Sequence, residues 1–271
     1  MAVPQYETLL LTLDDHILDI RLNRPKNANA MNAPMWQELQ AAFEWADETP
    51  AVRVVILSGE GKHFCAGIDL SMLTTIQPEE DDPCRANEAF LRHVRVLQRN
   101  LQSLQACRKP VLAAIHGACV GGAIDMTCYA DMRYASADAS FCVKEIDIGI
   151  VADVGTLQNL PSLIPEGLVR ELAFTGRNMS ADEACRAGFI NSVYDDRDAL
   201  MAGVRYIASC IAKKAPLATR GTKQVLNYTR DHSVEDGLEY VALWNASMMS
   251  KHEVREAMTA NLEKREPNFP D

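Results

Sequence analysis

Three carboxylates lie in one mostly apolar segment, residues 144–156, which reads KEIDIGIVADVGT. They are Glu145, Asp147 and Asp153. Acidic side chains are rarely buried unless they are paired or take part in chemistry. Two carboxyls set apart along an apolar pocket can remove a proton from one atom and return one to another. The segment therefore predicts acid–base chemistry, although Asp153 also fits a plain helix N-cap and Asp147 fits a structural role.

Two glycine-containing segments, HFCAGIDL (63–70) and HGACVGGAID (116–125), place small residues where a strand gives way to a turn and a helix. Small residues allow the backbone to approach a ligand closely, and a helix N-terminus presents free N–H groups and a positive dipole end. Two such ends that face each other would form an oxyanion hole for a carbonyl that becomes an enolate. Two turns without a function remain the alternative, and Asp125 also fits a structural acid in a first helical turn.

Other reaction centres find no support in the sequence. No serine lies in a G-x-S-x-G elbow, and no spacing of metal ligands occurs, so we expect no metal site. His63 and His116 flank the two glycine-containing segments, but a single histidine beside a turn is more often structural, and we rank both below the acids.

Composition excludes several classes of protein. The chain has 271 residues, which suits one large domain with at most a small appendage. A net charge of −10 argues against a broad surface for nucleic acid or anionic membranes. No apolar stretch is long enough to span a bilayer, and eight scattered cysteines without a C-x-x-C pair indicate reduced thiols. The N-terminal MAVPQYETLL resembles no signal peptide, so we expect a cytosolic protein, or a mitochondrial or peroxisomal one whose targeting segment is missing or unrecognised.

The order of predicted elements indicates a β/α core followed by a helical tail. Residues 16–23 and 52–61 read as strands, and 30–46 as a helix between them. A polar loop over 71–87 leads into a helix over 88–104. Residues 109–130 read as strand, glycine-rich turn and helix, and 132–145 as two strands, the second ending at Glu145. From Ala199 onward only helices are predicted, so we expect a core over 1–198 and a helical region over 199–271.

Taken together, these segments resemble the crotonase (enoyl-CoA hydratase/isomerase) superfamily. The matching pieces, in order from about Tyr6 to Val193, include LNRPKNANAMN, FCAGIDL, KPVLAAIHGACVGGAIDM, ADMRYASADASFCVKEIDIGI and ELAFTGRNMSADEACRAGFINSV. The resemblance implies an α/β fold, a spiral of strand–strand–helix turns with a C-terminal all-helical region that packs into homotrimers or dimers of trimers.

The resemblance also implies an acyl-CoA ligand and no separate cofactor. Its thioester oxygen would bind the backbone N–H groups of Ile68 and Gly122, carried over by motif position. Candidates for coenzyme A itself are Arg24 and Lys26 in the NRPK loop, Ala66, and Lys264 near the C-terminus. For the charged three, solvated surface positions are the alternative.

The acids separate the subfamilies. Hydratases that resemble this chain carry two glutamates, which fall at Asp125 and Glu145 here, and most carry glycine at the position of Asp153. The set of Asp125, Glu145 and Asp153 resembles the Δ3,5-Δ2,4-dienoyl-CoA isomerases of fatty-acid β-oxidation. Such a reaction removes a proton from carbon 2 and returns one to carbon 6, which requires two separate carboxyls. A 2-enoyl-CoA hydratase with an altered first acid is the alternative, and a non-catalytic or RNA-binding protein of this fold is a third hypothesis.

Overall fold

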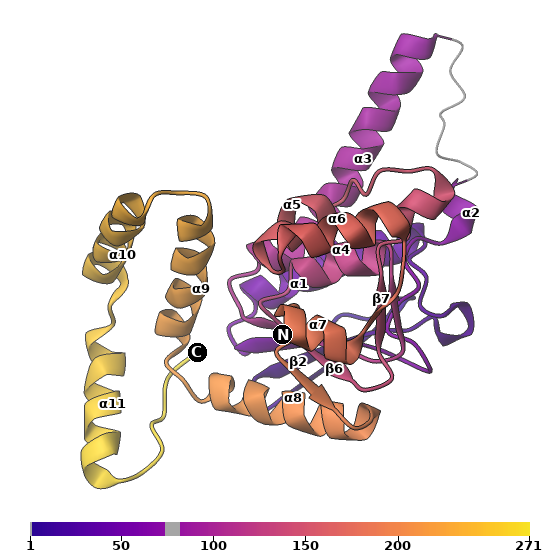
Figure 1. The fold of residues 1–271 in the computed structure, drawn as a ribbon. Coiled ribbons are helices and arrows are strands. Elements are labelled where there is room, and N and C mark those ends of the chain that lie inside the picture. The colour runs from indigo at the N-terminus through magenta and orange to yellow at the C-terminus, as the bar shows by residue number, and fades with distance from the viewer. Residues whose placement is uncertain (1, 74–81) are drawn as a thin grey trace.

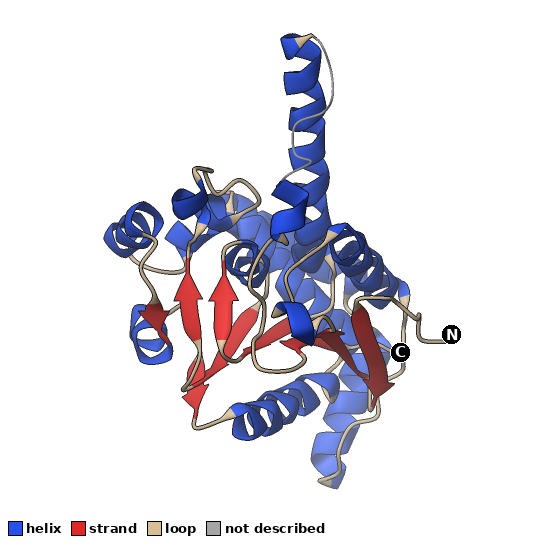
Figure 2. Ribbon diagram, turned by 90° about the vertical axis from the view of Figure 1, so that its right-hand side faces the viewer, coloured by secondary structure: helices blue, strands red, loops and turns tan. Residues whose placement is uncertain are grey.

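The computed structural model describes residues 2–73 and 82–271. Its main sheet has six strands in the order β1-β2-β3-β4-β6-β9 (Figure 2). Only β1 and β2 pair in antiparallel fashion, and the other neighbours are parallel. The strand bounds are β1 Leu9–Asp14, β2 Ile17–Leu22, β3 Val54–Gly59, β4 Val111–Ile115, β6 Met132–Ser136 and β9 Ser192–Tyr194.

The central strands are buried on both faces, as expected for parallel strands covered by helices. Alternation along β3 sends Val55 and Leu57 into the larger core cluster, while Val54 and Ile56 pack on the opposite face. Helices α1 (Ala33–Glu48) and α3 (Pro83–Ala106) pack against each other, and α1 contributes to the larger cluster. Helix α8 (Arg197–Ala212) covers the opposite face.

A second sheet contains three short strands, β5 Ala118–Val120, β7 Ser140–Cys142 and β8 Met179–Ser180, in the order β5-β7-β8. Around it lie four further α-helices: α4 Gly122–Cys128, α5 Thr156–Asn159, α6 Glu166–Thr175 and α7 Ala181–Ala187. The sequence predicted neither β1 nor the short strands β5 and β8. The helix predicted over 88–104 begins earlier, at Pro83, where Asp82 caps it. Residues 74–81 of the loop predicted over 71–87 lie outside the described residues.

The prediction that Glu145 ends a strand is wrong. Strand β7 ends at Cys142, and Glu145 opens a 3-10 helix, η2 (Glu145–Ile148), which closes on Gly149 in the left-handed region. In a continued strand, Asp147 would lie on the same side as Glu145, but both residues belong to this 3-10 helix instead. Asp147 instead forms an ion pair with Lys144 at the surface, which supports the structural role expected for it.

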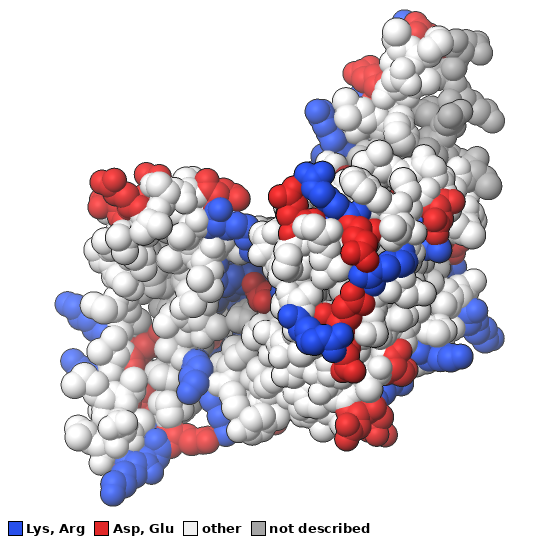
Figure 3. All heavy atoms as spheres, viewed as in Figure 1, with Lys and Arg blue, Asp and Glu red and all other residues white. Residues whose placement is uncertain are grey.

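The chain ends in three helices beside the core: α9 Pro216–Arg230, α10 Val234–Met248 and α11 Lys251–Glu263 (Figure 1). The division into a core and a helical region at residue 198 stays a prediction. Helix α8, which follows that position, packs on the main sheet. Large apolar side chains of the last three helices are exposed, among them Leu226, Val234, Leu238, Leu243 and Leu262. On the face in Figure 3, acidic and basic side chains are interspersed. Among the described residues, no helix is both long and apolar enough to cross a membrane.

Candidate active site

One cavity of about 160 Å³ contains every residue predicted to catalyse. Asp125 from α4, Glu145 from η2 and Asp153 from the segment before α5 line it, together with Ile68 and Gly122. Apolar side chains form most of the remaining wall: Trp36, Leu73, Phe90, Val94, Leu97, Ile148, Ile150 and Val154. No group of three or more metal-ligating side chains that could hold an ion occurs in the part of the chain that the structure describes.

The two glycine-containing segments lie side by side, because Cys65 and Cys119 form a parallel β-bridge between them. The Cys65 N–H donates to Ala118 O at 3.0 Å, and Cys65 O accepts from Val120 N–H at 3.1 Å. A short distance on, the backbone N–H groups of Ile68 and Gly122 have no acceptor within residues 2–73 and 82–271. Two free N–H donors at one end of an apolar cavity are the arrangement that an oxyanion hole needs.

Gly67 allows these donors to approach each other. Its φ is +90°, and a Cβ atom there would lie 2.6 Å from Val120 O and 3.3 Å from Gly122 N. We therefore expect Gly67→Ala to separate the donors and to lower kcat by about 10²–10³-fold, the usual cost of losing one oxyanion donor. Steady-state kinetics with the acyl-CoA that the family resemblance implies would measure this.

Gly167→Ala is the matched control, since a Cβ atom there meets nothing within 4 Å. It should leave kcat close to wild type. Full activity in Gly67→Ala would contradict the oxyanion assignment.

The pKa of each of the three carboxyls is raised, chiefly by burial in the cavity. Burial raises the pKa of Asp125 to about 7, and the charge of Glu145 adds to the increase. Burial likewise raises the pKa of Glu145, and the charge of Asp153 adds to it, although backbone hydrogen bonds act in the opposite direction. The pKa of Asp153 is also raised by burial, against the charge of His93. Burial in the cavity therefore favours the protonated form of each carboxyl more than water does.

The two carboxyl oxygens of Asp125 have different surroundings. Oδ1 accepts the N–H of Thr156, the first residue of α5, at 2.5 Å. Asp125 therefore caps α5 in trans, whereas Asp153 does not, and the alternative role of Asp153 as an N-cap is excluded. Oδ2 of Asp125 and Oε2 of Glu145 are buried without a hydrogen-bond partner among the described residues. Because the charge of Glu145 raises the pKa of Asp125, the two carboxyls lie close enough to interact, and one proton held between them would satisfy both orphaned oxygens.

The raised pKa of Asp125 predicts a pH-dependent stability. The folded protein keeps this proton up to about pH 7, whereas the unfolded chain releases it near about pH 4. Wild-type stability should therefore decrease as pH rises between these values. Asp125→Asn retains an oxygen that can accept the Thr156 N–H, but it carries no charge at any pH. The free energy of unfolding of this variant relative to wild type should therefore increase from pH 4 to pH 7, by on the order of 2 kcal/mol.

Urea unfolding of both proteins at pH 4.5 and pH 8 would measure this difference. A difference in the free energy of unfolding between the two proteins that is the same at pH 4.5 and pH 8 would contradict the buried, high-pKa Asp125.

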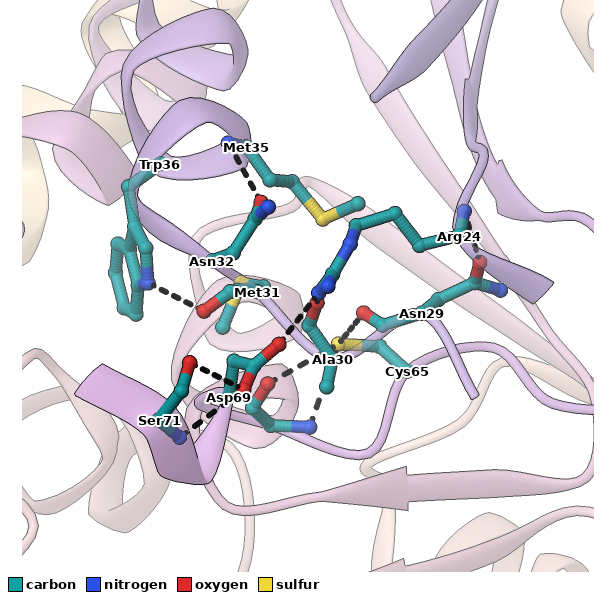
Figure 4. A network of polar contacts seen from close by, with 11 residues as sticks. Arg24, Asn29, Ala30, Met31, Asn32, Met35, Trp36, Cys65, Asp69 and Ser71 are labelled. Carbon is teal, nitrogen blue, oxygen red and sulfur yellow. Dashed lines mark hydrogen bonds and ion pairs between the residues drawn. The ribbon is translucent and has the colours of Figure 1, made fainter. Parts of the chain in front are cut away.

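Arg24 holds the segment that carries Ile68. Its guanidinium donates to Asp69 Oδ2 at 2.8 Å and also to Ala30 O. Asp69 Oδ1 in turn accepts the N–H and the hydroxyl of Ser71, at 3.1 and 2.8 Å. Figure 4 shows this network, with Arg24 reaching across to Asp69. The guanidinium is thus engaged within the protein, and its role toward coenzyme A stays a prediction.

The other candidates for coenzyme A lie in different places. Lys26 is exposed in the 3-10 helix η1 (Pro25–Asn27), and the adjacent Ala28 accepts the N–H of Ala66 at 2.9 Å. The loop that carries Lys26 therefore lies beside the segment that carries Ala66 and Ile68. Lys264 ends α11, which lies on the other side of the molecule from α2 (Leu70–Leu73) and α4 (Figure 1). Within one chain, the structure does not bring Lys264 to the cavity.

Sequence analysis missed the contribution of helix α3 to the cavity. Phe90, His93, Val94 and Leu97 line it, at the spacing of one helix face. Trp36 of α1 was missed too, and its indole donates to Met31 O at 3.1 Å. By contrast, the interpretation of the two flanking histidines as structural agrees with their contacts, because His116 bonds Gly61 O and His63 accepts Ala118 N–H.

The chain is similar to known proteins over nearly its whole length. A sequence model described as enoyl-CoA hydratase/isomerase matches residues 12–271. The chain is 42% identical to a peroxisomal Delta(3,5)-Delta(2,4)-dienoyl-CoA isomerase of Arabidopsis thaliana, with 99% of each chain covered. It is 41% identical to a mitochondrial Delta(3,5)-Delta(2,4)-dienoyl-CoA isomerase of Mus musculus, covering 96% of this chain and 81% of that one.

Among solved structures, an enoyl-CoA hydratase from Bacillus anthracis superposes with a TM-score of 0.89 at 29% identity, covering 97% of this chain and 99% of that chain. The superposition includes the C-terminal helices, so the α/β fold class with its helical C-terminal region is confirmed.

Proposed function

The chain belongs to the enoyl-CoA hydratase/isomerase family, and on this premise we propose that it is a dienoyl-CoA isomerase of fatty-acid β-oxidation. It converts a 3,5-dienoyl-CoA into the 2,4-dienoyl-CoA. The observation that carries this assignment is the third acid, Asp153, in the same apolar cavity as Asp125 and Glu145. The names of relatives that are 41–42% identical support it.

The reaction moves one proton and two double bonds. The thioester oxygen accepts the N–H groups of Ile68 and Gly122, which stabilise negative charge on that oxygen. Glu145 removes a proton from carbon 2, and the electron pair enters a conjugated trienolate that extends from the thioester oxygen to carbon 6. Asp153 donates its proton to carbon 6, so that double bonds form at carbons 2 and 4. Loss of one proton and gain of another leaves the atoms and the charge balanced.

Geometry supports this division between the two acids. A Cβ atom at Gly121 would lie 3.2 Å from Glu145 Oε1, so the Glu145 carboxyl lies against the backbone next to Gly122. Carbon 2 is bonded to the thioester carbon and therefore lies close to the same donors. Asp153 lies in a different segment, which Gln98 of α3 contacts, and can serve the more distant carbon 6.

The charge state suits a shuttle with one base and one acid. Burial raises the pKa of Glu145 and of Asp153, and their mutual repulsion disfavours two charges at once. A pair that holds a single proton has one group to accept and one to donate. Asp125 tunes the pair, since it shares the buried space with Glu145 and fixes the start of α5.

The remaining features of the substrate and the assembly are part of the same proposal. Coenzyme A belongs to the substrate, and no separate cofactor is required by the reaction. The exposed apolar residues of α9 to α11 favour a homotrimer or a dimer of trimers. The relatives named above are peroxisomal and mitochondrial proteins, which favours an organelle of β-oxidation over the cytosol for this one.

The purified protein tests the proposal with two substrates. Isomerisation is followed as the conjugated 2,4-diene forms from a 3,5-dienoyl-CoA, and hydration as the double bond of a 2-enoyl-CoA is lost. We expect rapid isomerisation and slow or no hydration. Strong hydration without isomerisation would replace the proposal by a 2-enoyl-CoA hydratase. Salt-sensitive RNA binding without affinity for acyl-CoA would support the non-catalytic hypothesis.

A further inference from the structure

The segment that carries Asp153 has no regular secondary structure. It links η2 to α5, and the N-cap residue of α5 is Gly155, which has no side chain to cap the helix. A φ of +142° at Gly155 is accessible to glycine and strained for other residues. The position of Asp153 therefore depends on contacts from other elements.

Three such contacts hold the backbone of this segment. Gln98 Nε2 of α3 donates to the carbonyl of Asp153 at 2.7 Å. The Tyr129 hydroxyl donates to the carbonyl of Val154 at 3.1 Å. Asp125 accepts the N–H of Thr156, as described above. Of the three, only Gln98 contacts Asp153 itself.

The carboxyl of Asp153 has no side-chain hydrogen-bond partner of its own within the described parts of the chain. The direction of this carboxyl is accordingly set by the backbone of Asp153, whose own N–H donates a hydrogen bond to the carboxyl. A misplacement of about 1 Å at a reacting group can cost on the order of 10²-fold in rate. A single hydrogen bond to the Asp153 carbonyl can therefore control the proton transfer that this acid performs.

We propose that Gln98 is a positioning residue for Asp153, which aims the carboxyl at the distal carbon of the substrate. The inference rests on the proposed isomerase function. Leu97, the neighbour of Gln98 on α3, lines the cavity, so the same turn of the helix forms the wall of the acyl site and holds the acid.

Gln98→Met tests the proposal, because methionine keeps the length of the side chain and lacks the N–H donor. Gln105→Met is the matched control on the same helix, since no hydrogen bond from the Gln105 side chain occurs among the described residues. Each protein is incubated with a 3,5-dienoyl-CoA in D₂O. Formation of the conjugated diene reports both transfers, and deuterium entry at carbon 2 of the remaining substrate reports the first transfer alone.

For Gln98→Met we expect kcat of isomerisation to fall about 10- to 100-fold, with KM close to wild type. Exchange at carbon 2 should persist, so the ratio of exchange to isomerisation should rise by about the same factor. The ratio does not depend on the fraction of folded protein, so a loss of stability cannot imitate the result. An unchanged ratio in Gln98→Met, or an equal rise in Gln105→Met, would overturn the positioning role. Absence of isomerisation in the wild-type protein would instead overturn the proposed function.

Discussion

Asp153→Asn is expected to abolish isomerisation while the exchange of the carbon 2 proton continues. Asparagine occupies nearly the same volume and keeps the backbone carbonyl that Gln98 contacts, but it has no proton to give to carbon 6. The oxyanion donors and Glu145 remain in place, so the first transfer is intact. Loss of a general acid should lower the rate of diene formation by about 10²–10⁴-fold.

Ultraviolet absorbance of the conjugated diene and proton NMR of the substrate in D₂O would measure the two steps separately. Isomerisation at the wild-type rate in Asp153→Asn would remove this residue from the mechanism. Loss of both processes together would mean that Asp153 acts at carbon 2 rather than carbon 6.

Glu145→Gln is expected to stop both processes, because the Glu145 carboxyl is the one placed against the backbone beside Gly122, where the first proton is taken. Without that transfer no trienolate forms, and Asp153 has nothing to protonate. We expect a loss of about 10²–10⁴-fold in isomerisation and a matching loss of exchange at carbon 2.

The matched control is Asp147→Asn, two residues away in η2. Its carboxyl is exposed and paired with Lys144, and ion pairs at the surface contribute little. Both rates should stay close to wild type. If Glu145→Gln retained exchange at carbon 2 while Asp147→Asn lost it, Asp147 rather than Glu145 would be the base.

Much of the site could be predicted from the sequence because its parts carry local signals. The pair Gly121–Gly122 directly before a helix indicates a turn in which the backbone N–H of Gly122 is free to bind a ligand. An acid in an apolar run, such as Asp153, is costly unless it has a purpose. These signals are independent of the rest of the fold, and the cavity contains Ile68, Gly122 and the three acids predicted to catalyse, whereas Asp147 of the same apolar run lies at the surface.

The rest depends on contacts between distant segments. The apolar run up to Val143 favours a strand through Glu145, but the chain leaves the sheet after Cys142 and closes a 3-10 turn on Gly149. Gln98 and Asp153 are 55 residues apart and meet only because α3 packs beside that loop. A lysine or arginine in a loop likewise gives no sign of its partner, so the ion pair of Arg24 with Asp69 was not foreseen.

The mechanism is tested most directly by a single turnover in D₂O, with enzyme in excess over protiated 3,5-dienoyl-CoA and the product examined by NMR. Two separate acids predict a 2,4-dienoyl-CoA that carries one deuteron at carbon 6, because the proton of Asp153 has exchanged with solvent before the substrate binds. A product whose carbon 6 has received the protium removed from carbon 2 would contradict the account, as would the absence of any conjugated product.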